Sequence, residues 1–136
     1  MTTPAVLPHV DAVTAALTGA DLTVYFGGAP PGVVPTVAQP YTVLYPTPGR
    51  AVAASLADDL VDFVGEVQLT CVGLTAEQAA SVSDRAMAAL AARITVAGRV
   101  SWRPEFLDGQ PVQRDDDVTP PNFYAVARYR LRSIPQ

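Results

Sequence analysis

The stretch VGEVQLTCVGLTAEQAASVSDRAMAAL, from Val64 to Leu90, contains the two local patterns that decide the fold of this chain. In its first part, Val67, Leu69 and Cys71 alternate with polar residues, and a glycine then interrupts the pattern. A period of two is typical of a strand with one buried and one solvated face. We therefore predict a half-buried strand from Val64 to Val72.

A signal for the start of a helix follows this strand directly. The segment Thr75–Gln78 matches a capping box, in which the Thr75 hydroxyl accepts the backbone N–H of Gln78 and the Gln78 amide reaches back. Apolar residues then recur at helical spacing, and many of them are alanines, which allow close packing on a sheet. These features predict a helix from Ala76 to about Arg93.

The rest of the chain predicts short elements separated by proline and glycine. In chain order we expect a helix over about Pro8–Thr18, a strand over Asp21–Phe26, a loop over Gly27–Gly32, a strand over Tyr41–Tyr45, a mobile connection over Arg50–Asp62, a strand around Val96–Trp102, a hairpin turn at Asp108-Gly109 and a last strand from Asn122. This grouping favours an α+β domain over a repeated βαβ unit. We predict one domain over residues 1–136, with a largely antiparallel or mixed sheet of four to five strands packed by two helices.

The composition indicates a folded protein outside the membrane. Apolar residues make up 49% of the chain, too many for disorder, and no apolar run approaches the roughly 20 residues that a membrane-spanning helix needs. The formal net charge of −4 argues against binding nucleic acid by broad phosphate neutralisation, which requires a basic surface. The N-terminus lacks the basic and apolar regions of a signal peptide. We expect a soluble protein, synthesised in the cytoplasm, with no membrane partner.

Side chains suited to catalysis are scarce. His9 is the one histidine and Cys71 the one cysteine, so a Ser-His-Asp or Cys-His arrangement would need one of them. We expect His9 to be a solvated residue at the start of a helix, and Cys71 to be a small core residue on the apolar face of its strand. One cysteine and one histidine cannot supply the ligands that zinc prefers. The sequence predicts no catalytic residue, no cofactor and no bound metal.

Three consecutive carboxylates, Asp115, Asp116 and Asp117, form the one cluster that suits a hard cation. Neighbouring side chains of an extended segment point to opposite sides, so three in a row rarely converge on one ion. We favour a solvated or ion-paired loop that leads into the last strand. A divalent-metal-dependent enzyme that uses this cluster is the alternative.

The last predicted strand carries a row of cations. By alternation, Arg128, Arg130 and Arg132 lie about 7 Å apart on one face, opposite a mainly apolar face. One interpretation is the solvated face of an edge strand, where charge opposes aggregation. The other is a row that meets passing nucleic acid or pairs with an acidic segment of a neighbouring subunit, for which Asp115–Asp117 is a candidate.

Three segments together resemble a known family of virion proteins. They are YTVLYPTPG (Tyr41–Gly49), EVQLTCVGLTAEQAASVSDRAMAAL (Glu66–Leu90) and RDDDVTPPNFYAVARYRL (Arg114–Leu131). In order and content they resemble the tail-terminator and related neck proteins of long-tailed phages that infect actinobacteria, over most of the chain from about Tyr41. The nine cationic residues are all arginine, a composition that agrees with such a host.

The resemblance implies a structural virion protein that forms a homohexameric ring on the last ring of the tail tube. Such a ring ends tail-tube polymerisation and joins the tail to the head, so the implied partners are copies of the chain, the major tail-tube protein and the head-side connector or stopper protein. Genomic DNA would pass through the ring without specific binding. Because arginines that gripped DNA would hinder ejection, we favour subunit pairing for the arginine row. The expected interface residues are Asp115, Asp116, Asp117, Arg128, Arg130 and Arg132.

Other functions remain open at this point. A stopper or connector ring between portal and tail would share the location in the virion but differ in its partners. A small binding module of the host cell could share the order of elements, and the metal-dependent enzyme named above is a third class.

Overall fold

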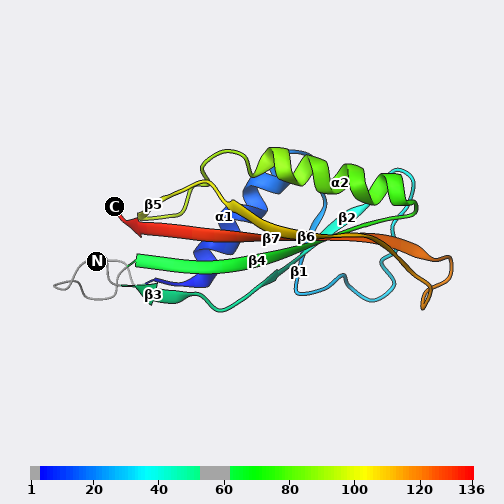
Figure 1. The fold of residues 1–136 in the computed structure, drawn as a ribbon, viewed down its shortest axis with the longest axis horizontal. Helices are drawn as coiled ribbons and strands as arrows, with labels where there is room; N and C mark the ends of the chain where they lie inside the picture. The colour runs from blue at the N-terminus through cyan, green and yellow to red at the C-terminus, as the bar shows by residue number, and fades with distance from the viewer. Residues whose placement is uncertain (1–3, 53–61) are drawn as a thin grey trace.

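The computed structural model describes residues 4–52 and 62–136, and within them the chain forms two helices and seven strands (Figure 1). In chain order these elements are α1 (Val6–Gly19), β1 (Val24–Phe26), β2 (Tyr41–Pro46), β3 (Arg50–Val52), β4 (Asp62–Gly73), α2 (Ala76–Ala89), β5 (Arg99–Ser101), β6 (Glu105–Asp115) and β7 (Asn122–Pro135).

All of these strands belong to one sheet. Its order is β1-β2-β4-β7-β5, with β3 also paired to β4 and β6 also paired to β7. Among the described strands, β1 and β2 run parallel, and every other pair is antiparallel. The predicted α+β class, with two helices on a largely antiparallel sheet, is confirmed.

Both helices pack on the same face of the sheet, and Figure 1 shows α1 crossing the strands. The main core lies between them and the sheet. The inward faces of β4 and β7 contribute the residues that alternation predicts, including Val67, Leu69, Tyr129 and Leu131, each at most 3% exposed. Cys71 is buried in this core as predicted, and burial raises the pKa of its thiol to about 11.

Among the described residues, the opposite face of the sheet is covered at one end only. There the connection between β1 and β2 packs Ala29 and Val33 over Tyr41, Val43 and Val72. The helices lie on the other side, and the described remainder of this face carries mainly polar side chains, with Val64 and Val126 among them. That uncovered area includes the outward residues of β7.

The predicted capping box forms with one difference. Thr75 accepts the backbone N–H of Gln78 at 3.1 Å, as expected, but the Gln78 side-chain oxygen accepts the N–H of Leu74, at 2.7 Å. The Gln78 amide nitrogen donates to the carbonyls of Thr36 and Val37. One side chain therefore starts α2 and also holds the long connection before β2.

Two strands were not predicted. The predicted turn at Asp108-Gly109 is wrong, because both residues lie within β6 and the chain reverses over residues 116–121. Register shifts after Phe106 and after Gln110 remove the period of two from this strand. The predicted mobile connection is also wrong at its start, where Arg50–Val52 forms β3; residues 53–61 lie outside the described residues.

His9 is not the solvated residue that was predicted. It is fully buried, and its ring stacks on Phe63 at 3.7 Å. Its Nδ1 lies 2.6 Å from the Ala5 carbonyl, which can only accept, so Nδ1 carries the proton and Nε2 accepts from the Ser133 hydroxyl. His9 is buried because the first turn of α1 packs against the ends of β4 and β7. Burial there lowers the pKa of His9.

Candidate assembly surface

The arginine row lies on the uncovered face of the sheet, where β7 carries Arg128, Arg130 and Arg132. One interpretation of the sequence placed this row on an edge strand, but β7 lies inside the sheet. It pairs with β4 from Phe63 to Gly73 along one side and with β5 and β6 along the other. The edge interpretation fails because β6, which covers the second side, was not predicted.

Arg128 is held by two carboxylates of its own chain. Its Nε and Nη2 donate to the two oxygens of Asp108 at 2.8 and 2.6 Å, and its Nη1 lies 3.2 Å from Glu66. The forked pair with Arg128 lowers the pKa of Asp108. The geometry places Arg128 in an internal network with little capacity left for another anion.

The other two arginines of the row form fewer ion pairs than Arg128. Arg130 lies 3.5 Å from Glu105, at the start of β6. Arg132 stacks over the indole of Trp102, with 5.2 Å between its guanidinium carbon and the ring centre. Within residues 4–52 and 62–136, no carboxylate pairs with Arg132. The stacking fixes the guanidinium and leaves its donors exposed.

A hollow opens on the uncovered face beside these two residues. It has a volume of about 510 Å³, and Arg50 of β3 contributes a third guanidinium to its lining. We call it the basic hollow and define it by Arg50, Arg130 and Arg132, with Thr47, Pro48 and Glu66 around them. Sequence reasoning missed Arg50, because nothing in a three-residue strand indicates its neighbour across the sheet.

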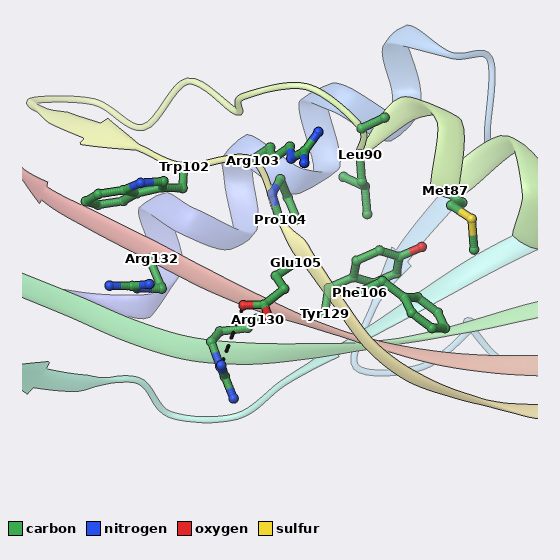
Figure 2. Close-up of a pocket in the computed structure, with 11 residues that line it drawn as sticks. Met87, Leu90, Trp102, Arg103, Pro104, Glu105, Phe106, Tyr129, Arg130 and Arg132 are labelled. Carbon is green, nitrogen blue, oxygen red and sulfur yellow. Dashed lines mark ion pairs between the residues drawn. The ribbon is translucent and has the colours of Figure 1, made fainter.

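A second depression, of about 370 Å³, lies where α2 ends and β6 begins. Figure 2 shows Trp102 above Arg132, and Phe106 beside Tyr129 and near Met87. Trp102, Phe106 and Met87 are each 43–46% exposed, so apolar side chains are accessible in this depression, next to charged ones such as Arg103 and Glu105. It continues from the helix side of the sheet to Arg130 and Arg132, which line both depressions.

The three aspartates lie at the other end of β7. Asp115 ends β6 opposite Asn122, and its carboxylate accepts the backbone N–H of Asp117 at 3.0 Å, while Asp116 pairs with Arg114. They form an ion-paired turn, which we call the acidic tip. In the described part of the chain, no three or more histidine, cysteine or acidic residues are arranged to hold a metal ion.

These surfaces are suited to binding another molecule by complementary charge and shape. The sheet carries arginines on one face, a depression with exposed apolar side chains adjoins them, and an acidic turn lies at the far end of β7. Neither described helix is long and apolar enough to span a membrane. The structure therefore brings Arg130 and Arg132 together with Arg50, and does not bring the aspartates of the same chain to the arginine row.

Comparison with known proteins supports the fold. No family model and no curated protein matches the chain. Among solved structures, a chain from the virion of a native gene transfer agent (GTA) particle matches with a TM-score of 0.56 and 22% sequence identity, over 93% of this chain and 87% of that chain. Nearly the whole fold is thus shared with a component of a virion particle.

Proposed function

We propose that this chain is a structural virion protein that forms a ring at the head-proximal end of a phage tail, where it ends tail-tube polymerisation and joins the tail to the head-side connector. The observation that carries the proposal is the fold shared with a chain of the GTA virion over 93% of this chain. The location of the protein would then be the virion, at the tail or neck.

The positions of the three resembling segments add support. They include β2, most of β4 with α2, and the turn after β6 with most of β7, which are central strands of the sheet, a covering helix and the acidic tip. Such a protein acts by complementarity. A tail tube grows because each ring exposes a surface that the next ring matches, and a terminator occupies that surface while presenting a different one.

The surface chemistry fits binding among proteins better than catalysis. Cys71 is buried with a raised pKa, and the His9 imidazole is enclosed by Phe63, Ser133 and Ala5. Arg128 is neutralised within the chain, so the arginine face is not a continuous cationic track for DNA. Passage of genomic DNA through a homohexameric ring without specific binding is consistent with this face.

The proposal is tested by mixing the purified protein with the major tail-tube protein of the same phage and imaging the tubes by electron microscopy. A terminator binds one tube end as a ring, and the mean tube length falls as its molar ratio rises. Tubes of unchanged length with bare ends would contradict the terminator role. Binding instead to the head-side connector alone would assign the chain to a stopper or connector ring.

A further inference from the structure

The basic hollow has the chemistry of a site for carboxylates. Three guanidinium groups line it, and the one acidic residue among its described lining residues, Glu66, is already paired with Arg128. Arg130 forms one ion pair, at 3.5 Å from Glu105, which is longer than the Arg128 pairs, and Arg132 is fixed by Trp102. Guanidinium forks bind carboxylates through paired hydrogen bonds, so an acidic segment of polypeptide fits this hollow.

The acidic tip has the matching chemistry. Residues 114–117 contain three aspartates and one arginine, a net charge of −2. The Asp116 side chain is 69% exposed even though it pairs with Arg114. The tip lies at the end of the long β6–β7 hairpin, which extends beyond the N-terminal end of α2 in Figure 1. It is therefore placed to contact another molecule.

The tip cannot reach the hollow of its own chain. Asp115 pairs with Asn122, and Arg130 lies eight residues further along the same strand. At about 3.3 Å per residue, roughly 26 Å of extended β7 separates the two sites. Among the described residues, the tip and the hollow lie at opposite ends of one strand, so the tip is placed to meet the hollow of a second molecule.

We propose that the acidic tip of one copy binds the basic hollow of the next copy, with Arg50, Arg130 and Arg132 holding Asp116 and Asp117. The contact is heterologous, since it joins different surfaces at opposite ends of the sheet, and it closes into a ring when the rotation between copies allows. Arg128 does not contact the tip in this arrangement; its ion pairs with Asp108 and Glu66 join β7 to β6 and β4 next to the hollow. This proposal rests on the proposed function, because it identifies the contact between neighbouring copies in the proposed ring.

Reciprocal charge reversal tests the contact directly. In the hollow variant, Arg130→Glu/Arg132→Glu, a negative hollow repels the natural tip. In the tip variant, Asp116→Arg/Asp117→Arg, a positive tip repels the natural hollow. In an equimolar mixture the two variants can alternate around an assembly. The natural tip of the hollow variant then meets the natural hollow of the tip variant, and the positive tip meets the negative hollow.

Association is measured by sedimentation velocity and native mass spectrometry at low salt. We expect the unchanged chain to associate, each variant alone to associate at least tenfold more weakly, and the mixture to recover assemblies with equal numbers of the two variants. Raising the salt concentration weakens all of them, because exposed charges are screened. Asp11→Arg/Asp84→Arg reverses two exposed helix carboxylates and is the matched control; it leaves association unchanged.

Three results would overturn the proposal: a chain that stays monomeric throughout, variants that associate like the unchanged chain, or a mixture without recovery. Circular dichroism first verifies that each variant folds. Where a reversal unfolds the chain, the neutral pairs Arg130→Gln/Arg132→Gln and Asp116→Asn/Asp117→Asn replace it, and each is expected to weaken association by a smaller factor.

Cross-linking provides a second measurement. In Thr47→Cys/Asp116→Cys, the new thiols lie in the hollow and on the tip, while Cys71 is buried with a raised pKa and does not compete. Mild oxidation should give a ladder of linked copies, and its absence would count against the contact. If the chain caps tail tubes but the mixture of variants does not reassociate, the proposed function stands and this contact is wrong. If the mixture reassociates but the chain does not cap tubes, the contact stands and the proposed function is wrong.

Discussion

The replacement Gly49→Ala probes how the end of the sheet that carries Arg50 is packed. A Cβ atom at position 49 would lie 2.0 Å from Cε2 and 2.3 Å from Cζ of Phe63. Carbon atoms in contact lie about 3.5 to 4.0 Å apart, so the ring would have to move by about 1.5 Å. Phe63 is 2% exposed and stacks on His9, which leaves the ring little room.

Overpacking of this kind costs about 1 to 3 kcal/mol of unfolding free energy. For a chain of this length, roughly 4 °C of melting temperature corresponds to each kcal/mol, so we expect Gly49→Ala to melt about 4 to 12 °C lower. Thermal unfolding followed by circular dichroism at one fixed protein concentration measures the shift. Gly19→Ala is the control, because a Cβ there meets nothing within 4 Å.

A double-mutant cycle with Phe63→Leu identifies the cause. The shorter side chain removes the ring atoms that the new Cβ would meet, so Gly49→Ala should cost much less in that background than in the natural one. Equal costs in both backgrounds, or a Gly49→Ala protein that melts with the unchanged chain, would refute the packing argument.

Two further perturbations have expected outcomes. The buried, neutral His9 has a lowered pKa in the folded state, chiefly because burial disfavours the imidazolium; the unfolded chain therefore binds a proton first as pH falls below about 6.5. The free energy of unfolding should consequently fall from pH 7.5 to pH 5.5 in urea titrations, and His9→Gln should flatten this dependence; a stability that rises toward acid would contradict the assignment. Thr75→Ala removes the cap of α2 and should cost about 1 kcal/mol, whereas Thr75→Ser retains most of it. Thr95→Ala, at an exposed position outside helices and strands, is the comparison; equal effects of Thr75→Ala and Thr95→Ala would show that the cap contributes nothing.

Local patterns predicted the central elements because their causes lie within a few residues of each other. Alternation along β4 requires only that one face be apolar, and the Thr75–Gln78 cap requires only a turn of helix. The same reasoning placed Arg128, Arg130 and Arg132 on one face of β7 and buried Cys71. Each of these predictions is confirmed.

Predictions that depended on a distant partner failed or were incomplete. The sequence around Asp108 resembles a turn, yet in the fold Asp108 lies within a strand and binds Arg128, 20 residues away in sequence. His9 has a polar side chain at a helix start, yet Ser133 supplies a hydrogen bond from 124 residues away. Neither partner leaves a mark in the local pattern.

The amino-acid sequence by itself determined the alternating strands, the capped helix, the buried thiol and the supply of arginines on one strand face, because each follows from the periodicity or capping of neighbouring residues. Only the tertiary structure decided that Arg128 is held by two carboxylates, and that Arg130 and Arg132 line a hollow together with Arg50. It also separated the acidic tip from that hollow. The physical reason is that ion pairing and burial depend on strand register and on which elements pack together, and those are set by contacts between residues far apart in the chain.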